Sequence, residues 1–180
     1  LYDKLLLKGK ELSGIKRALF FWAVDLGLKY ELNGANGAFY EFKRKIADKL
    51  IFSKWRVALG GNVKVVISGG AALQPRLARV FCCAGLPIQE GYGLTETSPV
   101  IAVNHAKWPN MRFGTVGPVL ENVEVKIAED GEILMKGPSL MMGDYKDAEK
   151  TAEVVETEGW FHTGDIGELQ YRNILKITDR

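Results

Sequence analysis

The sequence predicts an α/β protein, in which a partial α/β subdomain with helices and short strands is followed by a small antiparallel β-barrel-like subdomain. Over residues 15–58, apolar side chains recur at intervals of three and four, the spacing of amphipathic helices. After residue 99, glycine and proline punctuate short alternating runs, the pattern of strands joined by turns. We therefore expect the α/β subdomain at residues 1–108 and the β-barrel-like subdomain at residues 109–180.

The N-terminal part of the chain predicts helices that act as a scaffold. The first helix follows Ile15 and ends at Asn33-Gly34, where the apolar pattern breaks. Its buried face consists of Ala18, Leu19, Trp22, Ala23 and Leu26. The second helix carries an apolar face of Phe39, Phe42, Ile46 and Leu50. We expect a third helix to begin with Ser53 as its N-cap and to end before Gly60-Gly61.

Two glycine-containing loops follow two predicted strands. The β-branched run at residues 63–67 ends at Ser68-Gly69-Gly70-Ala71, and Pro75 is well placed to begin a helix that ends at Gly85. A second short strand leads into residues 90–97, Glu-Gly-Tyr-Gly-Leu-Thr-Glu-Thr. Because ligands bind beyond the carboxyl ends of strands in open α/β sheets, we expect both loops to lie at one binding edge.

Turn signals organise the second half of the chain. Apolar and charged side chains alternate over residues 123–127, before the turn Asp130-Gly131, and residues 133–136 form the returning strand. Asp147 is expected to be the N-cap of a short helix. These elements predict a small antiparallel sheet or barrel.

Composition and charge favour a small-molecule ligand. The chain has 180 residues, of which 47% are hydrophobic and 26% are charged, as in globular proteins. Its net charge of +2 gives no general attraction to nucleic acid, and no apolar run reaches the ~18 residues that span a bilayer. We expect a cytoplasmic protein with at most peripheral contact with a membrane. The adjacent Cys82 and Cys83 fit neither a disulfide framework nor a metal site, so we expect buried or inert thiols.

The segment Gly-Tyr-Gly-Leu-Thr-Glu that begins at Gly91 combines groups that a nucleotide needs. The Tyr92 ring could stack on adenine, a contact worth about 1–3 kcal/mol. Gly91 and Gly93 would let the backbone approach a ligand closely. Thr95 could donate a hydrogen bond to a phosphate oxygen, and Glu96 is a hard oxygen ligand of the kind that Mg²⁺ takes beside phosphate and water. The alternative is a glycine-rich surface turn with one solvated carboxylate.

Asp165 is a second candidate for nucleotide binding. Its carboxylate could accept both hydroxyls of a ribose, in charged hydrogen bonds of about 1.5–3 kcal/mol each, or it could cap its own turn. The turn at residues 68–71 is less specific, because glycine turns after strands are common. His162 has no partner carboxylate in view, which favours a packed or solvated imidazole over a catalytic one. Glu90 and Glu96 share a glycine loop, which argues for a phosphate ligand rather than a glycosidase pair.

The hairpin that follows Asp165 bears on the same site. Residues 165–170 should pair with residues 174–178 around Arg172-Asn173, since Asn tolerates the left-handed backbone of such a turn. We expect this pairing to direct the Asp165 carboxylate towards the loop that contains Tyr92.

Taken together, the motifs resemble those of the adenylate-forming enzyme superfamily. They occur in the order seen there, at residues 68–71, 91–97, 131–133, 159–165 and 178–180. Within the superfamily, residues 47–54 and 97–101 resemble the long-chain fatty-acid–CoA ligases, which are AMP-forming acyl-CoA synthetases. The tyrosine-glycine-threonine-glutamate motif is highly specific, and the other segments support it by order and spacing. The absence of an initial methionine and the strand-like last residues lead us to expect an internal fragment.

The resemblance implies a reaction in two steps. A fatty carboxylate attacks the α-phosphate of Mg-ATP to give acyl-AMP and pyrophosphate, and the thiol of CoA then displaces AMP. The implied partners are therefore ATP, fatty acid and CoA, with Mg²⁺ as cofactor and no nucleic acid. In such a reaction the protein contributes positioning and charge neutralisation rather than a nucleophile.

The resemblance also implies roles for individual residues. Tyr92 packs on adenine, Thr95 contacts the α-phosphate and Glu96 holds Mg²⁺, so Thr95 and Glu96 are the catalytic candidates. Asp165 and Arg180 bind ribose. The remaining cofactor-binding positions are Gly69, Gly70, Ala71, Glu90, Gly91 and Gly93.

Two parts of the family pattern are absent from these 180 residues. One is a Ser/Thr/Gly-rich phosphate loop with its lysine, which normally lies upstream. The other is a small C-terminal domain with its own lysine, which normally begins after a hinge just beyond Arg180. We therefore expect the isolated chain to be inactive. Two alternatives stay open: an adenylate-forming ligase for another carboxylic acid, such as a medium-chain, aryl or amino acid, and a non-catalytic nucleotide-binding or interaction module.

Overall fold

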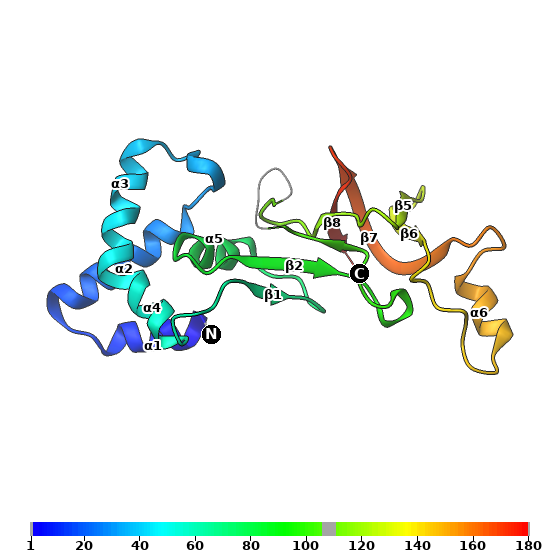
Figure 1. Ribbon diagram of the computed structural model, residues 1–180, viewed down its shortest axis with the longest axis horizontal. Helices are drawn as coiled ribbons and strands as arrows, with labels where there is room; N and C mark the ends of the chain where they lie inside the picture. Colours follow the sequence, from blue (N-terminus) through cyan, green and yellow to red (C-terminus); the bar gives the residue numbers. More distant parts are fainter. Residues whose placement is uncertain (1, 106–110, 180) are drawn as a thin grey trace. The chain divides into compact units, whose positions relative to one another are not determined.

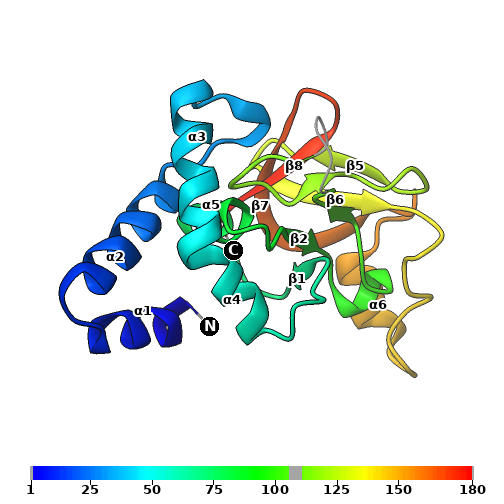
Figure 2. The same cartoon turned by 60° about the vertical axis from the view of Figure 1, so that its left-hand side comes forward.

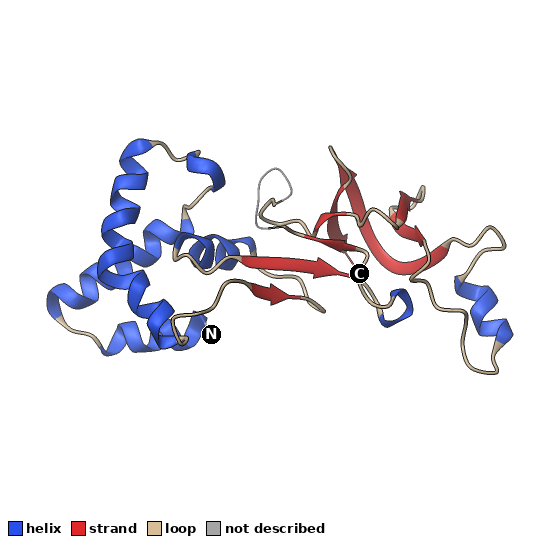
Figure 3. Cartoon of the chain, viewed as in Figure 1, coloured by secondary structure: helices blue, strands red, loops and turns tan. Residues whose placement is uncertain are grey.

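The fold is that of a computed structural model, which describes residues 2–105 and 111–179. The chain divides into two compact units, one comprising Leu1–Val66 and Leu73–Ile88, the other comprising Ile67–Ala72 and Gln89–Arg180. Helices dominate the first unit and strands the second, so the predicted mixture of helices and strands is confirmed (Figure 1, Figure 3). The predicted boundary between residues 108 and 109 falls outside the described residues and stays a prediction.

The first unit is built around helix α2, which packs against α1, α3 and α5 (Figure 2). The helices are α1 Tyr2–Glu11, α2 Gly14–Leu28, α3 Ala38–Ala47, α4 Ser53–Ala58 and α5 Pro75–Cys83. Ala23 and Leu26 of α2 are buried as predicted, whereas Ala18 is exposed. The pattern break is confirmed as well, because Asn33 adopts a left-handed φ of 59° in the short 3-10 turn Leu32–Gly34.

The second and third predicted helices form one continuous helical segment. A π-helical stretch, Asp48–Phe52, connects α3 to α4. The prediction that Ser53 is an N-cap is therefore wrong: its backbone is helical, at φ −55° and ψ −37°, and its hydroxyl donates to Lys49 O at 3.1 Å. The predicted helix end is confirmed, since Gly60 and Gly61 both have positive φ.

The apolar face predicted for the second helix is largely open to solvent. It consists of Phe39, Phe42, Ile46 and Leu50, which are 72%, 61%, 38% and 38% exposed. The helix packs inwards through Tyr40 and Ala47, which are seven residues apart and share a different face. The Tyr40 hydroxyl donates to Leu26 O at 2.6 Å. Periodicity thus predicts this helix but not the face that it buries.

A three-stranded sheet of order β1-β2-β3 carries the glycine-containing loops. Its strands are β1 Val66–Ser68, β2 Ile88–Tyr92 and β3 Ala102–Val103. β2 and β3 are antiparallel, with Gly91 opposite Val103. The first predicted strand is shorter than expected, because pairing begins at Val66 rather than Val63. Pro75 begins α5 and Gly85 follows its end with φ +72°, both as predicted.

A five-stranded antiparallel sheet of order β4-β8-β7-β6-β5 forms most of the second unit. Its strands are β4 Gly117–Pro118, β5 Glu124–Ile127, β6 Glu132–Lys136, β7 Phe161–Gln170 and β8 Ile174–Asp179. Among the described residues the outermost strands β4 and β5 do not pair with each other, as a closed barrel requires. The expected antiparallel sheet is therefore confirmed, and of the two expected forms, sheet or barrel, the described strands adopt an open sheet.

The turns of the second unit follow the sequence prediction. Asp147 caps helix α6, Ala148–Val154, by accepting from Lys150 N at 3.0 Å. The β7–β8 hairpin turns through Arg172 and Asn173, whose φ values of 65° and 55° are both left-handed. The core beneath these strands contains Ile101, Ala102, Val123, Ile133, Met135, Phe161 and Leu175. Over the described residues, no helix is long and apolar enough to cross a membrane.

Candidate nucleotide site

Tyr92 and Asp165 meet within the second unit although they lie 73 positions apart in sequence. The hydroxyl of Tyr92, the last residue of β2, donates to Asp165 Oδ2 in β7 at 2.8 Å. Asp165 is only 3% exposed, and Tyr92 is half-buried. The expected direction of the Asp165 carboxylate, towards the loop that contains Tyr92, is confirmed.

A bulge in β7 lies at the position of Asp165. His162 pairs with Leu134, and Ile166 pairs with Glu132. Between these two pairs β6 advances by two residues and β7 by four, so β7 carries two extra residues there. Bulges re-aim side chains relative to a regular strand. The bulge is therefore the local feature that sets the direction of Asp165.

Side-chain hydrogen bonds shape the bulge from within. Thr163 Oγ1 donates to Ile133 O at 2.7 Å and accepts from Asp165 N at 3.2 Å. Gly164 has φ +70°, a conformation that residues with a Cβ rarely adopt. The Thr163-Gly164-Asp165 sequence is thus suited to this bulge, which residue spacing alone does not reveal.

The loop after Tyr92 is fixed by its own backbone and by Thr97. A Cβ on Gly93 would lie 1.6 Å from Pro99 O, so only glycine fits there. The buried Thr97 hydroxyl donates to Pro99 O at 2.9 Å and accepts from Leu94 N at 3.0 Å. The space that a side chain at residue 93 would need is therefore filled by the protein itself, and the ligand-binding role expected for Gly93 stays a prediction. Thr97 thus accepts from the N-cap residue Leu94 as the third residue of a capping box does, a contact that sequence reasoning missed.

Thr95 and Glu96 lie on the outer side of this loop. Thr95 is exposed and Glu96 is partly exposed. Neither side chain makes a hydrogen bond or ion pair with another described residue, and neither is joined to Asp165. The main chain of Glu96 is anchored, because Glu96 O accepts from Met141 N at 2.7 Å. The two side chains thus project from a loop whose backbone is held.

The remaining predicted positions are less closely joined. Gly69, Gly70 and Ala71 form an exposed loop after β1, where a Cβ on Gly69 would lie 3.6 Å from Gly91 O. This contact puts the first glycine-containing loop beside the end of β2. Glu90 is 8% exposed, and its main-chain oxygen accepts from Asn104 N at 2.8 Å. Arg180 lies outside the described residues, so its ribose assignment stays a prediction.

His162 has two carboxylate partners, which corrects the expectation that it has none. Its Nδ1 lies 2.7 Å from Glu132 Oε2, and its Nε2 lies 3.1 Å from Glu156 Oε1. The hydrogen bond with Glu132 raises the pKa of His162, partial burial opposes this, and Glu156 adds to the increase. Sequence reasoning missed these partners because Glu132 and His162 meet only through the register of β6 and β7.

The described residues suit a metal ion that arrives with phosphate better than a metal held by protein alone. No three His, Cys, Asp or Glu side chains gather as a metal site within residues 2–105 and 111–179. Mg²⁺ bound to a nucleotide typically uses one or two carboxylates besides phosphate and water. Glu96, a partly exposed carboxylate on an anchored loop, fits that requirement.

Comparison with known proteins assigns the chain to a family. Residues 20–145 match the family described as AMP-binding enzyme, a range that includes both glycine-containing loops. The chain belongs to this family.

Curated relatives that the chain resembles include fatty-acid–CoA ligases. The chain is 40% identical over 147 residues to long-chain-fatty-acid–CoA ligase FadD15 of Mycobacterium bovis, which covers 82% of this chain and 24% of the relative. It is 36% identical over 198 residues to fatty acyl-CoA synthetase A of Dictyostelium discoideum, covering 100% of this chain and 28% of the relative. The chain therefore spans about a quarter of the length of the curated relatives it matches.

A solved structure supports the same fold. Apo MatB from Rhodopseudomonas palustris aligns with a TM-score of 0.59 at 29% identity, over 64% of this chain and 25% of that protein. The resemblance to adenylate-forming enzymes, and within them to the long-chain fatty-acid–CoA ligases, is thus confirmed.

Proposed function

We propose that this chain is part of an ATP-dependent long-chain-fatty-acid–CoA ligase. In the first step a fatty carboxylate attacks the α-phosphate of ATP, forming acyl-AMP and releasing pyrophosphate. In the second step the thiol of CoA attacks the acyl carbon, forming the thioester and releasing AMP and a proton. The observation that carries the proposal is the hydrogen bond from Tyr92 to Asp165, because it joins the two nucleotide motifs at one place.

The proposed nucleoside subsite uses Tyr92 and Asp165. The half-buried Tyr92 ring would pack on adenine, and the Asp165 carboxylate would accept ribose hydroxyls. An ionised carboxylate offers about four acceptor positions, so Asp165 can bind a ribose hydroxyl while it accepts from Tyr92. Arg180 and the loop of Gly69, Gly70 and Ala71 complete the proposed subsite.

The proposed phosphate subsite uses Thr95 and Glu96. Thr95 would donate its hydroxyl proton to an α-phosphate oxygen, and Glu96 would hold the Mg²⁺ that accompanies ATP. The ion would neutralise phosphate charge as the pyrophosphate leaves. The support is the outward placement of both side chains on a backbone held by Gly93, Thr97 and Met141.

A substitution of Glu96 in the whole enzyme tests the proposal. Glu96→Ala should lower ATP-dependent pyrophosphate release by about 100-fold or more, since an electrostatic contact with the transferring phosphate is lost. Its melting temperature should fall by no more than about 2 °C, because a partly exposed loop carboxylate carries little packing. Glu121→Ala, at an exposed position in the turn before β5, is the matched control.

Three results would count against parts of the proposal. A large fall in melting temperature with near-normal pyrophosphate release would make Glu96 a structural residue. A panel of carboxylic acids tests the substrate separately. A preference for medium-chain, aryl or amino acids would leave the proposed adenylation step intact but would contradict the long-chain fatty acid as substrate. The 180-residue chain alone should form no measurable acyl-CoA; robust thioester formation by it would contradict the need for the family's phosphate loop and second lysine.

A further inference from the structure

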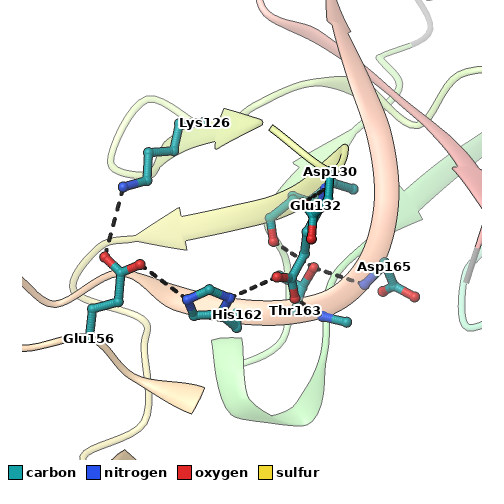
Figure 4. Close-up of polar contacts among 9 residues, drawn as sticks. Lys126, Asp130, Glu132, Glu156, His162, Thr163 and Asp165 are labelled. Carbon is teal, nitrogen blue, oxygen red and sulfur yellow. Dashed lines mark hydrogen bonds and ion pairs between the residues drawn. The ribbon is translucent and has the colours of Figure 1, made fainter. Parts of the chain in front are cut away.

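The Glu132 carboxylate connects two points of β7 on either side of Thr163. Its Oε2 lies 2.7 Å from His162 Nδ1 (Figure 4). Its Oε1 accepts from Gly164 N at 2.8 Å. Both contacts come from the first residue of β6 and reach the strand that contains Asp165. The carboxylate therefore fastens the start of the β7 bulge to its middle.

We propose that Glu132 is a positioning residue for nucleotide binding, which holds the β7 bulge in the shape that directs Asp165 at the ribose. This inference rests on the ribose role of Asp165 in the proposed function. Glu132 itself touches no nucleotide in the proposal; it acts through the Gly164 amide.

The bulge needs such a side-chain contact because the β7 residues between His162 and Ile166 are not paired with β6. Ile133, the β6 residue opposite the bulge, already accepts the Thr163 hydroxyl through its carbonyl oxygen. The Gly164 amide points instead to Glu132 Oε1, which replaces the missing ladder partner. Gly164 is also the residue with the left-handed backbone, so its orientation decides where the next residue, Asp165, points.

His162 is the group that holds Glu132 in place. Its imidazole lies between Glu132 and Glu156, and the second oxygen of Glu156 lies 3.8 Å from Lys126 Nζ (Figure 4). Asp130 faces the same strand end, where its Oδ1 accepts from Glu132 N at 3.0 Å. Ionised carboxylates only accept hydrogen bonds, so only the imidazolium form of His162 can donate to both.

The sign of the pH effect follows from the raised pKa of His162. The contribution of the imidazolium is fully present below the ordinary pKa of about 6.5. It is lost as the pH rises through the raised value in the folded protein, because the neutral ring keeps one N–H and can donate to only one carboxylate. The hydrogen bond from His162 to Glu132, and with it the affinity for ATP, should therefore weaken over the same pH range.

The kinetic test compares three variants of the whole enzyme. Glu132→Ala should raise the KM for ATP about tenfold and change kcat by less than about twofold, since it removes a charged hydrogen bond that acts on binding. Glu132→Gln can still accept from Gly164 N, so its KM should stay within about threefold of wild type. In Glu132→Gln, the KM for ATP should also no longer change with pH over the range in which His162 loses its proton. Glu168→Gln, which removes an exposed carboxylate from the same strand, should match wild type in KM and in pH profile.

A spectroscopic test measures the link between His162 and the Gly164 amide without any nucleotide. In the 180-residue chain labelled with ¹⁵N-glycine, the Gly164 amide signal should shift with pH at the midpoint of the His162 ring. Glu132→Ala should abolish this shift, and Glu168→Gln should leave it unchanged. A Gly164 signal that ignores the His162 titration in the wild-type chain would overturn the proposed linkage.

The two tests together separate this inference from the proposed function. A normal KM for ATP in Glu132→Ala, with its amide shift abolished, would make Glu132 a strand-stabilising residue and overturn its positioning role. A wild-type enzyme that forms no thioester from ATP, acid and CoA would instead refute the proposed function, and the ribose role with it, whatever the amide signals show.

Discussion

Substituting Gly93 with alanine tests how the loop after Tyr92 is packed. The new Cβ would lie 1.6 Å from Pro99 O, 2.7 Å from Pro99 C and 2.9 Å from Val100 Cα. All three are backbone atoms, so no side-chain rotation relieves the clash and the Leu94–Pro99 loop has to move. Overpacking of this kind costs about 2–3 kcal/mol, which lowers the melting temperature of a chain of this size by about 4–12 °C.

Gly91→Ala is the matched control for this prediction. Its Cβ would meet Ala102 O at 3.8 Å, an ordinary van der Waals contact. The stability of this variant should therefore stay within about 1 kcal/mol of wild type. Thermal unfolding of both variants, followed by circular dichroism on the same day and buffer, gives the comparison. Equal melting temperatures for Gly93→Ala and Gly91→Ala would refute the argument that the Pro99 carbonyl excludes a side chain at residue 93.

Two further predictions concern the hairpin turn and the cysteines. Asn173→Val should destabilise the chain by about 1–2 kcal/mol, because a β-branched residue tolerates the left-handed φ of 55° poorly, whereas Asn173→Gly should match or exceed wild type in urea denaturation. Burial raises the pKa of Cys83 to about 11, so only about 0.1% of it is thiolate at pH 8 and iodoacetamide should modify Cys82 first, as peptide mass spectrometry can show. Faster modification of Cys83, or a valine variant as stable as the glycine one, would contradict the respective argument.

Local signals in the sequence predict the elements that depend on neighbouring residues. Pro75 and Gly85 bound helix α5, Asp147 caps α6, and Asn173 supports the β7–β8 turn, as expected. Each of these signals works through backbone conformation or capping within a few residues. The expectation for Ser53 failed because a serine hydroxyl can also bond to the preceding helical turn, as it does to Lys49 O.

Features that depend on strand pairing could not be predicted from spacing. Glu132 and His162 are 30 positions apart, and their contact requires the shifted register between β6 and β7. The hydrogen bond from Tyr92 to Asp165 was expected only as a general direction, without its atoms. The order of the five-stranded sheet likewise depends on which strands pair, so local signals left an open sheet and a barrel as alternatives. The roles of the site residues at a nucleotide, and the cytoplasmic location, stay predictions.

The two extra residues in β7 have a consequence for insertions and deletions. Because their number is even, Phe161, Thr163, Asp165 and Gly167 all remain on the buried side along the strand. Removing Gly164 and Asp165 together would keep this in/out phase and leave an ordinary strand that lacks the carboxylate. Removing one residue would reverse the in/out alternation of all later side chains in β7, so that the buried positions would face solvent. Length changes at this point of the gene should therefore be tolerated in steps of two residues and not of one.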